Sequence, residues 1–199
     1  MIDKFEHKAD SYDSEDRRVK NVDAIANMIK ESIELNKNMS IIDFGSGTGL
    51  LLERIAPYVK QITAIDKSPS MNRQLMAKIE HLPCKVEIKE IDIIDTEFDT
   101  KFEAIISSMT IHHIEDVKEL LQKFYNLLTD DGVIALADLD SEDGTFHKVD
   151  TGVFHFGFNR EEFKSWASDV GFKDIKIQDA SIVEKPYGKY GVFLLTARK

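Results

Sequence analysis

The sequence predicts an α/β protein built on a mostly parallel β-sheet, with helices on both faces and an antiparallel last strand. Helical stretches separate the apolar, strand-like runs, which lie at 41–44, 62–65, 104–107 and 133–137. Parallel strands need crossover connections of this kind, and a sheet covered on both faces produces nearly continuous apolar runs. Two further runs, 172–183 and 190–197, are joined through Pro186-Tyr187-Gly188, which predicts an antiparallel hairpin.

Two helices are predicted from the spacing of their apolar residues. The first has one apolar stripe at three- and four-residue intervals, formed by Val22, Ile25, Ala26, Ile29 and Ile33. The second places Phe163, Trp166 and Val170 on one side and meets Gly171, which is typical of a helix C-cap. Both stripes are expected to pack against the sheet.

A glycine-rich loop follows the first predicted strand. Residues 41–49 read Ile-Ile-Asp-Phe-Gly-Ser-Gly-Thr-Gly, and an apolar helical stretch begins at Leu50. Glycine lets the backbone turn sharply and approach a ligand closely, and the following helix start offers unpaired N–H groups. The dinucleotide fingerprint G-x-G-x-x-G would need its third glycine at position 50, where this chain has leucine. The loop therefore predicts a cofactor site of a different kind.

Polar residues follow the next strands at the positions where a ligand would be bound. Asp66 follows the run 62–65, Asp92 follows the run 85–91, and Ser108 follows the run 102–107. In open α/β sheets the ligand lies beyond the carboxyl ends of the strands, where the strand order reverses. These three residues and the glycine loop are expected to meet there.

Three motifs together resemble the class I S-adenosylmethionine-dependent methyltransferases. They are D-x-G-x-G-x-G at 43–49, Asp66 followed by Lys67-Ser68-Pro69-Ser70-Met71, and H-H-x-x-D at 112–116. The last motif and the aromatic opening segment (5–13) are similar to the small-molecule branch that includes ubiquinone and menaquinone C-methyltransferases. The resemblance covers roughly residues 5 to 140. It implies a Rossmann-like seven-stranded sheet and S-adenosyl-L-methionine as cofactor.

The resemblance also implies roles for individual residues. The glycine loop would pack against the methionine half of the cofactor, Asp66 would bind the ribose hydroxyls, and Asp92 would bind the adenine amino group. An aromatic residue of the opening segment, Tyr12, would help to close the site. The cofactor-binding residues expected in this way are Tyr12, Asp43, Gly45, Ser46, Gly47, Gly49, Asp66, Lys67, Met71, Asp92, Ile93, Ser108 and His113.

The segment 138–159 is predicted to choose the methyl acceptor. It contains His147 and His155 among four phenylalanines, and imidazole is a suitable proton acceptor at neutral pH. We therefore predict His147 and His155 as catalytic candidates, with His113 as a third that has either a binding or a basic role. The competing interpretation is that Phe154, Phe156 and Phe158 form one face of an ordinary strand and that the histidines are structural.

The same segment allows a metal hypothesis, with Asp138, Glu142, His147 and His155 as ligands. These residues lack compact metal-ligand spacing, and the acidic run is also typical of a solvated loop. We therefore predict no metal.

Composition limits the remaining function classes. The chain of 199 residues has 26 basic and 36 acidic residues, a formal net charge of −10, which argues against nucleic acid as substrate. No apolar run is long enough for a membrane span, and the lone Cys84 excludes an intramolecular disulfide. We expect a cytoplasmic monomer or homodimer. Its single domain (1–199) would comprise a helical lid (1–36), a cofactor-binding core (37–140) and an acceptor-side region (141–199).

The function predicted is methyl transfer from S-adenosylmethionine to a small-molecule acceptor by in-line displacement. One alternative is a nicotinamide-dependent oxidoreductase on a similar sheet, which the glycine spacing and the absence of a Tyr-x-x-x-Lys pair disfavour. Another is a methyltransferase-like protein that binds the cofactor without catalysis.

Overall fold

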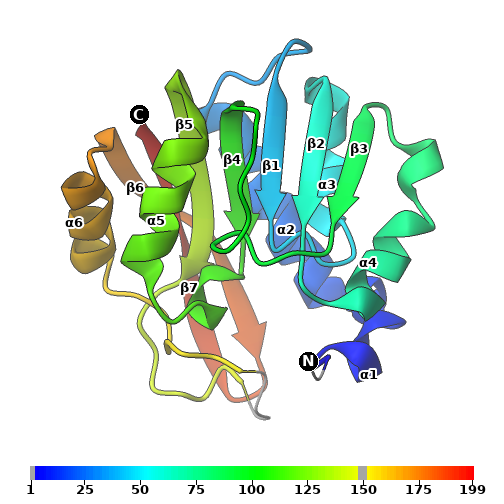
Figure 1. Cartoon of the computed structure of the whole chain (residues 1–199). Coiled ribbons are helices and arrows are strands. Elements are labelled where there is room, and N and C mark those ends of the chain that lie inside the picture. The colour runs from blue at the N-terminus through cyan, green and yellow to red at the C-terminus, as the bar shows by residue number, and fades with distance from the viewer. Residues whose placement is uncertain (1–2, 148–151) are drawn as a thin grey trace.

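The computed structural model describes residues 3–147 and 152–199, and in this part of the chain seven strands form one sheet. The sheet order is β3-β2-β1-β4-β5-β7-β6 (Figure 1). The strands are β1 (Ser40–Phe44), β2 (Gln61–Ile65), β3 (Lys85–Lys89), β4 (Phe102–Ser108), β5 (Leu128–Leu139), β6 (Lys173–Lys185) and β7 (Gly188–Arg198).

The directions of the strands agree with the prediction. Strands β1 to β5 pair in parallel, β7 runs antiparallel to β5, and β6 runs antiparallel to β7. The hairpin β6–β7 turns between Lys185 and Gly188, as the Pro-Tyr-Gly sequence predicted. The Rossmann-like sheet with an antiparallel last strand is confirmed.

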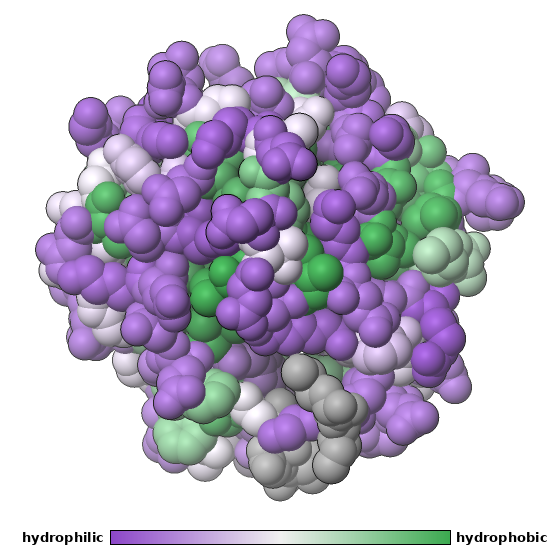
Figure 2. Space-filling view, in the orientation of Figure 1, coloured by the Kyte–Doolittle hydropathy of each residue, from purple (hydrophilic) through white to green (hydrophobic). Residues whose placement is uncertain are grey.

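Helices cover both faces of the sheet. Their bounds are α1 (Glu6–Ala9), α2 (Asp16–Ser32), α3 (Leu50–Ile55), α4 (Pro69–Met76), α5 (Val117–Leu127) and α6 (Arg160–Val170). One core cluster joins α2 and α3 to the sheet, and a second joins α5 and α6 to its other face. Hydrophilic residues dominate the visible outer surface (Figure 2), since the apolar sides of these helices are buried.

Both helices predicted from apolar spacing are present. The stripe of α2 is buried at Val22, Ile25, Ala26 and Ile29. Helix α6 buries Phe163 and ends at Gly171, which has a left-handed φ of 112° and so acts as the predicted C-cap.

The segment after β5 differs from a strand. Phe154 and Phe156 are 58% and 56% exposed, whereas Phe158 is buried and makes only an isolated bridge to Asp140. The alternating-strand interpretation of the phenylalanines is therefore wrong. The chain here is held by backbone hydrogen bonds to the His112 carbonyl oxygen and to the end of β5. Gly157, at φ 69°, packs against the Asp140 carbonyl, where a Cβ would lie 2.0 Å from the oxygen.

Strand β1 lies between β2 and β4, which places the reversal of strand order at the centre of the sheet. The chain leaves β1 toward β2 on one side, while β4 occupies the other side (Figure 1). The loops after β1, β2 and β4 therefore meet at one edge of the sheet. Across the described residues, no helix combines the length and apolarity that crossing a bilayer requires.

Candidate active site

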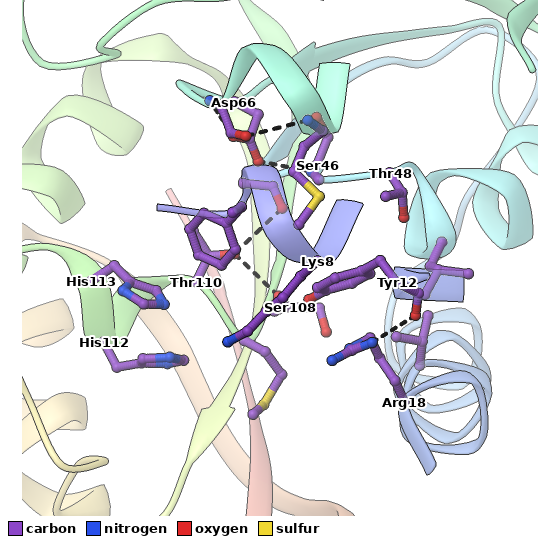
Figure 3. A pocket seen from close by; sticks show the side chains of 18 of the residues that line it. Lys8, Tyr12, Arg18, Ser46, Thr48, Asp66, Ser108, Thr110, His112 and His113 are labelled. Atoms are coloured by element: carbon purple, nitrogen blue, oxygen red, sulfur yellow. Dashed lines mark hydrogen bonds between the residues drawn. The ribbon is translucent and has the colours of Figure 1, made fainter. Parts of the chain in front are cut away.

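A cavity of about 1330 Å³ opens at the carboxyl ends of the central strands. Its lining includes the glycine loop, the residues after β2 and β4, the N-terminal segment and part of the loop after β5 (Figure 3). Pockets that bind one drug-sized ligand are roughly 300–1,000 Å³. This cavity is large enough for a cofactor and an acceptor together.

The glycine loop is shaped by three left-handed residues. Gly45, Gly47 and Gly49 have φ of 69°, 54° and 86°, a region that residues with a Cβ rarely adopt. The N–H groups of Gly45 and Ser46 donate to the Ile65 carbonyl oxygen at 2.8 and 3.2 Å. These bonds fix the loop to the end of β2.

Gly45 and Gly47 differ in what a side chain would meet. A Cβ on Gly45 would lie 2.1 Å from the Thr110 side chain, whereas a Cβ on Gly47 would meet nothing within 4 Å and would enter the cavity. We expect Gly45→Ala to lower the free energy of unfolding by about 3 kcal/mol, through strain and overpacking. Gly47→Ala carries only the backbone cost of about 1 kcal/mol. Urea denaturation of both variants tests this order, and equal losses would contradict it.

Asp66 links the glycine loop to the turn after β2. Its Oδ2 accepts from the Gly47 N–H and its Oδ1 from the Ser68 N–H, both at 2.8 Å. Burial raises the pKa of Asp66, and the two backbone hydrogen bonds oppose that effect. The carboxylate is thus held in a fixed orientation at the edge of the cavity, as the predicted ribose-binding role requires.

Four buried polar atoms, on residues of the cavity lining, have no hydrogen-bond partner among the described residues. They are Asp43 Oδ2, Ser46 Oγ, Ser108 Oγ and His112 Nε2. Buried polar groups in native proteins are nearly always paired, so these atoms indicate a missing ligand. Burial and the neighbouring Asp66 raise the pKa of Asp43 to about 8, and a cationic ligand group would offset both effects. The donors and acceptors present fit the polar, positively charged cofactor that the sequence predicted.

The remaining predicted cofactor residues divide into two groups. Lys67 and Met71 line the cavity, and the Met71 N–H is capped by the Ser68 hydroxyl at the start of α4. Asp92 is paired with Lys67, and Ile93 is 1% exposed in the second core cluster. Neither Asp92 nor Ile93 lines the cavity, and Ile91 takes that place. The expected adenine contact of Asp92 and the expected cofactor-binding role of Ile93 remain predictions.

The N-terminal segment closes one side of the cavity. Tyr12 lines it, and the Arg18 guanidinium stacks 3.7 Å from the centre of the Tyr12 ring. The Thr48 hydroxyl donates to Asp13 at 2.5 Å, which fixes the segment to the glycine loop. Asp3 accepts from the Ser70 N–H at 3.0 Å and from the Ser68 hydroxyl, which fixes it to α4. Tyr12 therefore lies in the cavity wall, and its expected role in closing the site stays a prediction.

Three histidines gather at the other side of the cavity. The ring centres of His112 and His113 are 4.4 Å apart, and that of His147 lies 5.2 Å from His112 and 5.9 Å from His113. Burial, reinforced by the neighbouring His112, lowers the pKa of His113 to about 4 and that of His147 to about 3. Both rings are neutral at pH 7. Two of the predicted catalytic candidates, His113 and His147, thus lie together.

His112 is held by a fully buried carboxylate. Its Nδ1 lies 2.6 Å from Asp138 Oδ1, and its backbone N–H donates to Oδ2 at 3.2 Å. Burial would raise the pKa of Asp138, but the interaction with His112 and the backbone N–H donors keep it below its ordinary value. Asp138 therefore accepts from Nδ1–H, and the buried Nε2 of His112, a residue of the cavity lining, has no hydrogen-bond partner among the described residues.

The expected catalytic role of His155 is not supported by its position. Its Nε2 lies 2.9 Å from the Ile114 carbonyl oxygen and its ring packs on Phe158, outside the cavity lining. His155 attaches the loop after β5 to the end of the 3₁₀ turn at Ile111–His113 (η4). This contact favours a structural role for His155, and its predicted catalytic role stays a prediction that its position does not support.

The residues of the metal hypothesis are separated in the structure. Asp138 binds His112, Glu142 accepts from the Phe146 N–H, and His155 contacts the Ile114 carbonyl. Within residues 3–147 and 152–199, no three His, Cys, Asp or Glu side chains come close enough to hold a metal ion.

His112 was missed as a functional candidate from the sequence. The signal available was the pairing of β4 with β5. In this pairing Ser108, at the end of β4, lies opposite Ala137, and Asp138 is the next residue of β5. The turn η4, which carries His112, begins three residues after Ser108. A carboxylate at the end of β5 is thereby placed beside the H-H pair.

Comparisons with known proteins agree with this geometry. A family model described as a methyltransferase domain matches residues 14–177. An uncharacterized methyltransferase of Schizosaccharomyces pombe is 32% identical over 74% of this chain, and the match spans 56% of that protein's length. One from Bacillus cereus is 30% identical over 78% of this chain and 76% of its own length.

Solved structures share the fold at low identity. N-methyltransferase NodS from Bradyrhizobium japonicum, in complex with S-adenosyl-L-homocysteine, has a TM-score of 0.72 at 14% identity, covering 94% of this chain and 89% of NodS. Haemonchus contortus phosphoethanolamine N-methyltransferase 2, in complex with S-adenosyl-L-methionine, has a TM-score of 0.70 at 15% identity, covering 98% of this chain and 60% of that one.

The [4+2]-cyclase SpnF also has this fold, with a TM-score of 0.73 at 18% identity over 89% of this chain and 80% of its own. The fold alone therefore does not fix the reaction. The family itself is shown by the match over residues 14–177 and by the two curated relatives, with which the glycine loop agrees: the chain belongs to the class I S-adenosylmethionine-dependent methyltransferases.

Proposed function

We propose that this protein transfers the methyl group of S-adenosylmethionine to a small-molecule acceptor bound in the same cavity. The observation that carries the proposal is the set of four buried, unpartnered polar atoms around one cavity of about 1330 Å³. Three of them, on Asp43, Ser46 and Ser108, lie at the carboxyl ends of β1 and β4, and the fourth belongs to His112.

The residues fit a division of the cavity into two parts. The cofactor would be held by the glycine loop, Asp66, Met71 and Ser108, with Tyr12 closing over it. The acceptor would lie beside His112, His113 and His147. The N-terminal segment and the loop after β5 supply the walls that exclude water from this end.

When bound, S-adenosylmethionine supplies an electrophilic methyl group on a positively charged sulfur. The protein's contribution is to align the acceptor's attacking atom with that methyl, and alignment of this kind can supply about 7 kcal/mol or more. For a hydroxyl acceptor, His112 Nε2 takes the proton while Asp138 holds the ring and stabilises the resulting charge. Neutral His113 and His147 avoid repelling that charge.

The first test is calorimetric titration of the purified protein with S-adenosylhomocysteine and, separately, with NADH. We expect micromolar binding of S-adenosylhomocysteine only, accompanied by a higher melting temperature. A preference for NADH would instead support the oxidoreductase alternative.

Methyl transfer itself is tested by a screen of candidate acceptors for S-adenosylhomocysteine release. We expect at least one phenol, thiol, carboxylate or amine to be methylated, as identified by mass spectrometry of the product. Cofactor binding without any methylated product across these classes would support the non-catalytic alternative, and unchanged binding in His112→Ala and His147→Ala variants would then be expected.

A further inference from the structure

Basic side chains gather around the acceptor end of the cavity, although the chain as a whole has a net charge of −10. Lys4, Lys8 and Lys185 lie near the histidines at this end, close enough to lower the pKa of His113 or His147, whereas Arg17 and Arg18 line the side formed by the N-terminal segment. Acidic lining residues lie mainly at the cofactor end, as Asp43 and Asp66 do. The charge of this part of the cavity is therefore opposite to that of the protein.

Two of the cations already have partners. Glu15 pairs with both Arg17 and Arg18, each at 2.8 Å. Arg18 also stacks on Tyr12 and donates to the Tyr12 carbonyl oxygen, so its position is fixed by the protein itself (Figure 3). Arg17 and Arg18 thus form part of the wall, with Glu15 as their shared counter-ion.

Lys185 lacks a comparable counter-ion. Its ammonium group lies 3.4 Å from the centre of the Phe146 ring and donates to the Phe146 carbonyl oxygen, and no carboxylate of the described residues forms an ion pair with it. Burial and, after it, the charge of Arg17 lower the pKa of Lys185 to about 8, although the charges of Glu15 and Glu142 oppose this effect. A desolvated cation in this position is stabilised by a bound anion.

Lys8, in the N-terminal segment, is in a similar state. Burial and the charge of Arg18 lower its pKa, and within the described part of the chain its ammonium forms no ion pair. Figure 3 shows its side chain extending into the cavity, with the nitrogen toward His112 and His113. Both Lys8 and Lys185 lie close enough to His147 for their charges to lower its pKa.

We propose that Lys8 and Lys185 bind an anionic group, a carboxylate or a phosphate, on the methyl acceptor. This inference rests on the proposed function, because it assigns the substrate class of the same site. Both ammonium groups lie near His147, so an anion held by them would place the rest of a small molecule near the histidines. The acceptors that fit are therefore small organic acids or phosphate esters.

The test is calorimetric titration of the protein saturated with S-adenosylhomocysteine, using benzoate, phenyl phosphate and neutral benzyl alcohol as probes. Saturation ensures that the cofactor's own carboxylate is already in place. We expect at least one anionic probe to bind ten times or more tighter than benzyl alcohol, a gap of about 1.4 kcal/mol. Whichever anion binds more tightly identifies the carboxylate or the phosphate as the preferred group.

Variants separate the two lysines from the rest of the protein. Lys8→Met and Lys185→Met are each expected to weaken the anionic probe about tenfold or more and to leave S-adenosylhomocysteine affinity unchanged. Lys189→Met is the matched control, since Lys189 is 73% exposed on the same hairpin and pairs with Glu184. Lys185→Arg keeps the charge and is expected to retain binding of the anionic probe. Retained binding would show that a loss in Lys185→Met is due to the missing charge and not to misfolding.

Three results would overturn the inference: benzyl alcohol binding as tightly as both anions, neither anion binding to the loaded protein, or both Met variants binding the anion like wild type. Loss of S-adenosylhomocysteine affinity in folded Lys8→Met or Lys185→Met would also overturn it, because the cations would then serve the cofactor. Failure of the wild-type protein to bind S-adenosylhomocysteine at all is a separate outcome, which contradicts the proposed function.

Discussion

Replacing Asp66 by alanine is expected to weaken S-adenosylhomocysteine binding by about 100-fold or more, the equivalent of about 3 kcal/mol. The carboxylate is the only group at the end of β2 predicted to accept from the ribose hydroxyls, and hydrogen bonds to a charged group contribute about 1.5–3 kcal/mol each. The change also releases the Gly47 and Ser68 N–H groups that the carboxylate holds. Calorimetric titration measures the loss.

A matched variant for Asp66→Ala is Glu87→Ala. Glu87 also lies on this half of the sheet, in the edge strand β3, where it pairs with Lys89 and is 46% exposed. Its removal changes the net charge equally without touching the cavity, so affinity should stay at the wild-type value. Equal affinity for wild type and Asp66→Ala would show that the cofactor does not use the end of β2.

Replacing His112 by alanine is expected to lower kcat for a hydroxyl acceptor by about 100-fold or more, since a positioned general base typically contributes a factor of 10²–10⁴. The effect should fall on kcat, because Nε2 meets the attacking group rather than the cofactor. Asp138→Asn should lower kcat as well, through loss of the Nδ1–H acceptor that orients the ring. Steady-state kinetics with an acceptor from the screen measures the change in kcat, and S-adenosylhomocysteine titration shows whether cofactor affinity has changed.

His155→Ala serves as the histidine control. It removes the contacts of Nε2 with the Ile114 and Glu115 carbonyls but nothing in the cavity lining, so only thermal stability should fall. If His112→Ala retained wild-type kcat while His155→Ala lost it, the base would lie outside the cavity described here and the mechanism would need a different acceptor position.

Much of the fold could be predicted because its signals are local. The apolar run before the glycines, the stripe of α2 and the glycine after α6 each depend on near neighbours in the sequence. The cofactor loop was predictable for the same reason, since its glycines and Asp66 stand at fixed places after two strands.

The acceptor end could not be predicted equally well, because its contacts are between distant segments. His112 and Asp138 are 26 residues apart, and Lys8 and Lys185 come from opposite ends of the chain. Nothing in the local sequence distinguishes His147, which faces the cavity, from His155, which binds a backbone carbonyl. The sheet register and the turns after β5 decide that difference.

Gly45 and Gly47, two of the three glycines of the loop, are constrained in different ways, and this has an evolutionary consequence. A side chain at position 45 collides with Thr110 and is removed by selection for folding, whereas a side chain at position 47 projects only into the ligand space. One substitution at position 47 would therefore leave a well-folded, abundant protein that has lost its ligand. A lineage released from selection for methylation is expected to accumulate changes at position 47 before position 45. The residue at position 47 therefore distinguishes proteins that still bind the ligand from those that have lost it.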